Sequence, residues 1–188
     1  MTWIFGYGSL MWNPGFAYSR RRPAILNGYH RVYMMYSTRN RGTPASPGML
    51  VSLAPGRSCT GQAMLIEPGR EKEALAYLDE REGLGRAHRR VMVPLHLVDD
   101  GAGPALNAWT YLPILTYSNC IWGVPTPRQA ELVARGRGKI GSSYDYLRRM
   151  LDELAGMNVS EPMLEQLFQR VQQVRDGNSA SPAAPRLA

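Results

Sequence analysis

The order of strand-like and helix-like segments limits most strongly what this chain can fold into. Short runs rich in Val, Tyr, Met and Leu alternate with glycine and proline turns through the first half, and one helix-like segment interrupts them. The last third of the chain is helical in pattern. Such an order predicts an α+β fold built on a small curved sheet or barrel.

Turns and helix caps give the expected boundaries. Strands are expected at 3–5, 28–36, 49–53, 61–66, 89–98 and 106–112. The segments around Pro55-Gly56 are predicted as separate strands, and the last two would meet across an Asp100-Gly101 turn. Helices are expected at about 71–82, ended by Gly83, and at about 128–135, 143–154 and 160–176. The stretch 177–188 lacks periodicity and is expected to be a disordered tail after a domain of residues 1–176.

Positive charge is concentrated in the first third of the chain. The net charge is +7, and no Asp or Glu precedes Glu67, whereas seven arginines do. Such a segment can bind nucleic acid or form a site for small anions. The sequence has no helix-turn-helix spacing, RNP-like motif or zinc knuckle, so we favour small anions and expect no nucleic-acid partner.

The cysteines and the apolar runs of the sequence indicate the cellular compartment of the protein. Cys59 and Cys120 are far apart, show no metal-ligand spacing and fit a reducing compartment. No apolar run approaches the ~20 residues of a membrane helix, and Gly6 and Gly8 come too early for a signal peptide. We therefore expect a cytoplasmic protein that does not bind membranes.

A glycine loop, Phe5-Gly6-Tyr7-Gly8-Ser9-Leu10, follows the first expected strand directly. Two glycines let the backbone approach a ligand closely, so that successive N–H groups can converge on an anion. A dinucleotide fingerprint is excluded because Met11 stands at the position of its third glycine, and no acidic residue follows ~20 positions on. The loop is either a plain turn that ends a strand or a cradle for a carboxylate, and the basic, acid-free segment around it favours the cradle.

Glu82 is the second candidate, at the end of the first expected helix. It follows Leu78 by four residues and Leu75 by seven, so its side chain shares their apolar face and points inward. Partial burial and the negative end of the helix dipole both raise the pKa of such a carboxyl. This suits a group that acts first as a base and then as an acid near neutral pH. A simple ion pair with Arg86 or Arg89 is the alternative.

The residues around both candidates resemble one known family. The run WIFGYGSLMWNPGF and the following LNGYHRVYMMYSTRNRGTPASPGMLVSL are similar to the N-terminal half of ChaC-type γ-glutamyl cyclotransferases. The segment ALAYLDEREGLGRAHRR is similar to the stretch that carries the catalytic glutamate of that family, which falls on Glu82. The resemblance continues more loosely to about residue 175.

The resemblance implies both a fold and an activity. The fold would be a small mixed, barrel-like sheet flanked by helices. The enzyme would cleave glutathione to 5-oxoproline and cysteinylglycine by attack of the substrate's own amine, with Glu82 as general base and acid and with no metal or cofactor. The residues implied in binding the γ-glutamyl group are Gly6, Tyr7, Gly8, Ser9, Leu10 and Tyr146.

The C-terminal third departs from the family pattern in two stretches. Ile140 and Ser143 stand where the family usually has Ser and Asn, and residues 113–117 replace a segment that contains Asn-Pro. Because the resemblance places these stretches near the far side of the pocket, two alternatives stay open. One is cyclotransfer on another γ-glutamyl amine or amino acid, and the other is a non-catalytic member that binds an anion.

Overall fold

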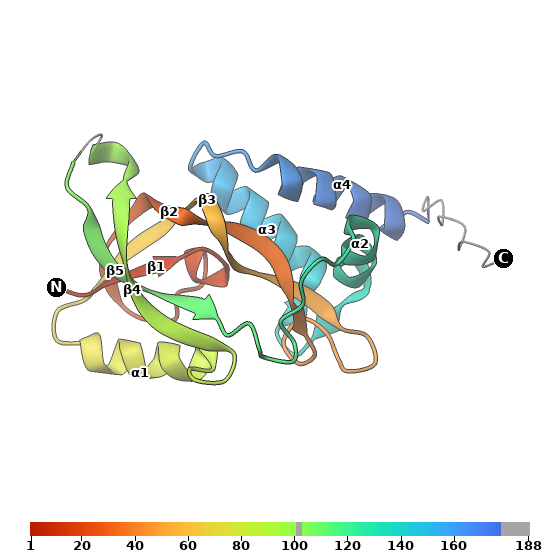
Figure 1. Cartoon of the computed structure of the whole chain (residues 1–188), viewed down its shortest axis with the longest axis horizontal. Coiled ribbons are helices and arrows are strands. Elements are labelled where there is room, and N and C mark those ends of the chain that lie inside the picture. The colour runs from red at the N-terminus through yellow and green to blue at the C-terminus, as the bar shows by residue number, and fades with distance from the viewer. Residues whose placement is uncertain (101–102, 178–188) are drawn as a thin grey trace.

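The computed structural model describes residues 1–100 and 103–177 and contains a closed barrel of five strands. These strands are β1 (Trp3–Gly6), β2 (Tyr18–Ser37), β3 (Gly48–Ile66), β4 (His88–Leu97) and β5 (Leu106–Pro113). Around the barrel they follow the order β1-β3-β2-β4-β5, and β5 closes the barrel by pairing in parallel with β1. The other neighbouring pairs are antiparallel. The predicted α+β class with a mixed, barrel-like sheet is therefore confirmed (Figure 1).

The two long strands β2 and β3 correct the sequence prediction. Separate strands at 49–53 and 61–66 are wrong, because β3 continues through Pro55-Gly56. Gly56 has φ of 100° and Arg57 of 57°, and Gly28 on β2 has φ of 83° at a register shift between the two strands. These residues act as a β-bulge that bends both strands together instead of reversing the chain. β2 also starts ten residues before the expected position, because the exposed arginines near its start hide the apolar alternation of a strand.

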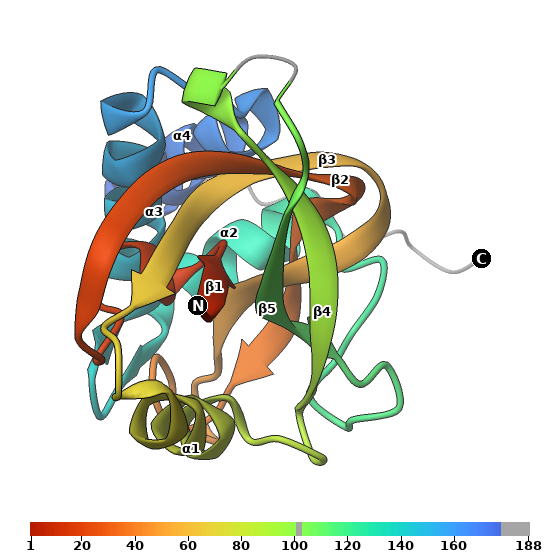
Figure 2. The same ribbon diagram turned by 90° about the vertical axis from the view of Figure 1, so that its left-hand side faces the viewer.

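The helices lie on two sides of the barrel. α1 (Glu71–Glu82) lies on one side by itself, whereas α2 (Thr126–Arg135), α3 (Ser143–Gly156) and α4 (Pro162–Arg175) gather on another side, where α2 and α3 contact β3 (Figure 2). Each of the four begins and ends within two residues of its predicted bounds. A small hairpin of β6 (Arg137–Gly138) and β7 (Gly141–Ser142) separates α2 from α3. The predicted turn at Gly101 and the predicted tail, apart from Gly177, lie outside the described residues.

The rotation of α1 about its axis is fixed by its apolar face. Ala74 and Leu78 are buried in a cluster shared with β1, β3 and β5. Gly83 ends the helix in a left-handed conformation with φ of 62°, and its N–H donates to the carbonyl of Glu80. Glu82 lies one turn after Leu78 and therefore faces the same side as the buried residues.

A larger apolar cluster fills the barrel and continues under α2, α3 and α4. Leu164, Leu167 and Val171 of α4 are buried in it, which confirms α4 as an amphipathic packing helix. No helix among the described residues has both the length and the apolar character needed to cross a membrane.

Candidate active site

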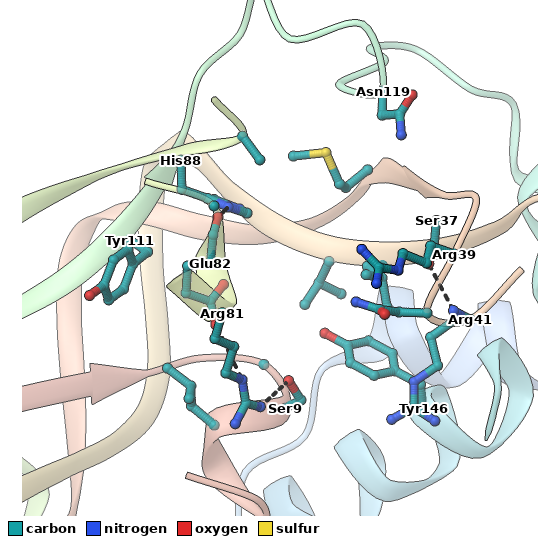
Figure 3. A pocket seen from close by; sticks show the side chains of 18 of the residues that line it. Ser9, Ser37, Arg39, Arg41, Arg81, Glu82, His88, Tyr111, Asn119 and Tyr146 are labelled. Atoms are coloured by element: carbon teal, nitrogen blue, oxygen red, sulfur yellow. Dashed lines mark hydrogen bonds and ion pairs between the residues drawn. The ribbon is translucent and has the colours of Figure 1, made fainter. Parts of the chain in front are cut away.

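A cleft of about 560 Å³ opens between the barrel and the C-terminal end of α1. Its walls come from the glycine loop after β1, the end of α1, the hairpin end of β2 and β3, and the start of α3. Glu82 lies on one side of this cleft, and Arg39 and Arg41 lie on the opposite side (Figure 3). The cleft thus brings together a carboxylate and a cationic wall from segments far apart in the sequence.

The glycine loop lines the cleft and carries free backbone N–H groups. A one-turn 3₁₀ helix, Ser9–Met11, starts directly after Gly8 and closes with a 2.9 Å bond from Met11 N–H to the Gly8 carbonyl. The N–H groups of Ser9 and Leu10 precede that bond and have no backbone acceptor among the described residues. N–H groups in such a position attract a negatively charged group.

Arg31, a buried residue of β2, holds this loop from the inside of the protein. Its Nε donates to the Tyr7 carbonyl at 2.7 Å, its Nη2 donates to the Thr60 carbonyl at 2.7 Å, and its Nη1 pairs with the Glu161 carboxylate. The hydroxyl of Tyr7 donates in turn to the carbonyl of Tyr111 at 2.8 Å. The loop is therefore fixed by the protein itself before any ligand binds.

Glu82 is the last residue of α1, and its side chain lines the cleft with 20% of its surface exposed. Burial raises the pKa of the Glu82 carboxyl above its usual value, while the positive charges of His88 and Arg81 partly oppose the shift. The alternative ion pair with Arg86 or Arg89 is absent among the described residues, and Glu82 Oε1 instead lies 3.6 Å from Arg81 Nε. The inward direction predicted for Glu82 thus agrees with the structure.

Two cations beside Glu82 are missed by the sequence prediction. Arg81 Nη2 donates to the hydroxyl of Ser9 at 3.0 Å, which joins α1 to the glycine loop. His88 Nδ1 lies 2.8 Å from the Glu82 carbonyl, a bond that requires a proton on Nδ1 and that satisfies a free carbonyl at the helix end. Arg81 and His88 both lie within the segment ALAYLDEREGLGRAHRR, and their nearness to Glu82 in that segment is the signal that could have marked them.

Tyr146 of α3 closes the cleft beside Gly8. Its side chain is 4% exposed and packs edge-on against Trp12, with the ring centroids 5.3 Å apart. A Cβ at Gly8 would lie 2.9 Å from the Tyr146 hydroxyl, so the lack of a side chain at Gly8 lets the tyrosine pack closely against the loop. Burial raises the pKa of Tyr146 well above its usual value, so the hydroxyl stays protonated and can donate a hydrogen bond.

The side of the cleft away from Glu82 is positively charged. Arg39 and Arg41 lie on that side (Figure 3), whereas Arg86 lines the cleft near Gly83. Among the described residues, none of the three has a carboxylate within ion-pair distance. The two stretches that depart from the family pattern also reach the cleft, which Tyr117 and Ile140 line. Ser143 does not, because it is buried at the start of α3, where its hydroxyl accepts from Met49 N–H at 3.0 Å.

Six of the seven predicted site residues meet at this cleft: Tyr7, Gly8, Ser9, Leu10, Glu82 and Tyr146. The seventh, Gly6, lies behind the loop, where a Cβ would come within 2.8 Å of Leu10 Cβ, so its lack of a side chain lets the loop turn. Within residues 1–100 and 103–177, no three His, Cys, Asp or Glu side chains gather in a group that could hold a metal ion.

The fold is that of the γ-glutamyl cyclotransferases. A crystal structure from yeast, described as a γ-glutamyl cyclotransferase specific to glutathione, is similar with a TM-score of 0.84 at 24% identity. That similarity covers 94% of this chain and 97% of the yeast chain. Another solved structure, described as a γ-glutamyl cyclotransferase, has a TM-score of 0.52 at 14% identity over 88% of this chain.

Within that class, the chain belongs to the ChaC-like protein family, whose model matches residues 2–174. Glutathione-specific γ-glutamylcyclotransferase 1 of Mus musculus is 34% identical over 175 residues, which cover 90% of this chain and 77% of the mouse protein. The glutathione-specific γ-glutamylcyclotransferase of Escherichia coli K12 is 28% identical over 92% of this chain and 74% of its own length. The family predicted from the sequence is therefore confirmed.

Proposed function

We propose that this protein is a γ-glutamyl cyclotransferase that cleaves glutathione to 5-oxoproline and cysteinylglycine, with Glu82 as general base and acid. The observation that carries the proposal is the shared cleft of Glu82 and the free N–H groups of Ser9 and Leu10. The names of the mouse and E. coli relatives support glutathione as the substrate.

The γ-glutamyl end of the substrate binds at the glycine loop. Its α-carboxylate accepts hydrogen bonds from the N–H groups of Ser9 and Leu10. Gly8 and Tyr146 line the cleft beside each other, and the protonated Tyr146 hydroxyl donates to an oxygen of the same group. These contacts leave the α-amine on the side of the cleft that carries Glu82.

The reaction needs no nucleophile from the protein. The Glu82 carboxylate takes a proton from the α-ammonium, and the freed nitrogen attacks the γ-amide carbon to form the five-membered ring. The bond from that carbon to the cysteinyl nitrogen then breaks as protonated Glu82 gives its proton to the departing nitrogen. The ring nitrogen gives its second proton to the Glu82 carboxylate, which passes it to the released amine of cysteinylglycine. Because attacking and attacked atoms belong to one molecule, the loop contributes mainly by holding them close together.

The cationic wall supports an anionic leaving group. Cysteinylglycine carries a carboxylate, whereas the amine released from a γ-glutamyl amine does not. Arg39 and Arg41 attract negative charge to the side of the cleft away from Glu82. This charge favours glutathione over a γ-glutamyl amine as the substrate.

The test is to incubate purified protein with reduced glutathione and to quantify 5-oxoproline and cysteinylglycine. We expect equal amounts of both products from the wild-type protein and none from Glu82→Gln. Glu73→Gln is the matched control, because it makes the same change at an exposed position of the same helix, and we expect it to retain turnover. Retained turnover in Glu82→Gln would exclude Glu82 as the base. If the protein turned over other γ-glutamyl compounds but not glutathione, the reaction class would stand and glutathione would be wrong as the substrate.

We also propose a cytoplasmic location and one domain spanning residues 1–176. The location rests on Cys59 and Cys120, which are both free thiols, as is usual in a reducing compartment. The domain rests on the shared apolar core, which extends from the barrel to α4.

A further inference from the structure

The guanidinium of Arg81 contacts both halves of the proposed active site. On the side of the loop, Nη2 donates to Ser9 Oγ at 3.0 Å, and Nη1 donates to the carbonyls of Asn13 at 2.7 Å and Pro14 at 3.3 Å. On the side of the helix, Nε lies 3.6 Å from Glu82 Oε1. All three guanidinium nitrogens of Arg81 therefore face either the substrate cradle or the proposed base (Figure 3).

The surroundings of Arg81 hold this arrangement in place. Its side chain is only 19% exposed, and Tyr77 lies one turn earlier on α1, with its hydroxyl 3.1 Å from Arg81 Nη1. A Cβ at Gly15 would lie 2.1 Å from that hydroxyl, so the segment after the glycine loop rests directly on the helix surface. A planar guanidinium can reach several acceptors at fixed angles at once, which a lysine cannot do.

We propose that Arg81 is a positioning residue that sets both the place of the glycine loop and the charge state of Glu82. The inference rests on the proposed function, because it assumes that the loop binds the γ-glutamyl group and that Glu82 transfers the proton. Charge-assisted bonds to Ser9, Asn13 and Pro14 fix the distance between the cradle and the base. A small displacement of either half is costly for a reaction that depends on close approach.

The electrostatic part of the proposal depends on the groups that face Glu82. From other elements these are His88 of β4, Tyr7 of the glycine loop and Tyr146 of α3. Burial raises the pKa of both tyrosines, so they remain neutral. Among the described residues, His88 and Arg81 are thus the groups that oppose the effect of burial on the pKa of Glu82. Without Arg81, burial is opposed by His88 alone, and the pKa of Glu82 rises further.

Two variants separate the two roles of Arg81, with kcat and KM for glutathione measured across pH. Arg81→Met removes both the positive charge and the planar guanidinium that donates to several acceptors. We expect the acid limb of kcat/KM to move to higher pH. We also expect the value of kcat/KM at the pH optimum to fall by about 10- to 100-fold. Arg81→Lys keeps a positive charge but loses the planar guanidinium with its several donors. We expect its acid limb close to that of the wild type and its kcat/KM still reduced. Arg70→Met is the matched control, because Arg70 is exposed and pairs with Glu73 at the other end of α1.

The outcomes decide the proposal in either direction. An acid limb that stays in place in Arg81→Met, or an equal loss of kcat/KM in Arg70→Met, overturns it. If Arg81→Met does not fold, as judged by circular dichroism, Arg81→Lys decides: reduced kcat/KM with an unmoved acid limb supports the proposal, and wild-type kcat/KM overturns it. Failure of the proposed function is distinguishable, since the wild-type protein would then release no 5-oxoproline.

Discussion

Arg31 donates a 2.7 Å hydrogen bond to the carbonyl of Tyr7, which places a buried cation directly behind the glycine loop. The same guanidinium bonds the Thr60 carbonyl of β3 and the carboxylate of Glu161, which immediately precedes α4. The shape of the loop therefore depends on residues distant in sequence. Its support is part of the core, whereas Ser9 and Leu10 line the cleft.

Arg31→Met is expected to destabilise the protein by about 3–5 kcal/mol, because the change leaves the Glu161 carboxylate without its buried partner. The carbonyls of Tyr7 and Thr60 also lose their donor. The free energy of unfolding from urea titrations checks this. Arg20→Met, at an exposed position of the same strand, is the control and should change stability little. Equal stability of the two variants would contradict the role assigned to Arg31.

The pH profile of the wild-type enzyme should report the raised pKa of Glu82. A general base works only when deprotonated, so kcat/KM falls as the pH drops through the pKa of Glu82. Burial raises that pKa, and we expect the acid limb above the value of about 4.3 that is usual for an exposed glutamate. Initial rates with glutathione across pH measure it. A limb at the ordinary carboxyl value would show that Glu82 is solvated or that another group limits the rate.

Glu82→Gln should be more stable than the wild type at neutral pH. Because its pKa is raised on folding, the folded state binds the Glu82 proton more tightly than the unfolded state does. Stability is therefore lost as the pH rises from the unfolded pKa through the folded pKa. The glutamine removes this loss, so the difference in Tm between variant and wild type should grow from acid to neutral pH. Thermal unfolding at several pH values checks it, and a variant less stable at neutral pH would contradict it.

Gly8→Ala should reduce turnover while the protein stays folded. The added Cβ would lie 2.9 Å from the Tyr146 hydroxyl, so the loop and Tyr146 would have to move apart and the cleft wall that they form would be distorted. We expect kcat/KM for glutathione to fall by about 10- to 100-fold. Gly156→Ala, at the end of α3 with open space around the position, is the control and should leave turnover unchanged. Normal turnover in Gly8→Ala would show that the glycine loop is not part of the substrate-binding site.

Local patterns predict the parts of this structure that depend on local interactions. The end of α1 follows from Gly83, and the direction of Glu82 follows from its spacing to Leu78, because both depend on helix geometry alone. The continuity of β3 does not follow from the sequence, because Pro55-Gly56 has the composition of a turn. Only its pairing opposite Gly28 shows it to be a bulge.

The supporting cations of the site could not be predicted for a similar reason. Arg31 belongs to the basic first third, and nothing in its neighbours marks it as the one that is buried. The role of Arg81 depends on the docking of residues 13–15 onto α1, a contact between segments that neighbour each other only in the folded protein. Long-range packing of this kind leaves no periodic signal in the sequence.

The closure of the barrel has a consequence for the synthesis of the protein. β1 is made first, yet its parallel neighbour β5 begins only at Leu106, and the partner of Arg31 is Glu161. Contacts between such distant segments form slowly, because long stretches of chain must be brought together first. The glycine loop leaves the ribosome early but gains its final support only after α3 has emerged. Each new molecule therefore acquires a complete active site only after the segment that carries Glu161 has been made.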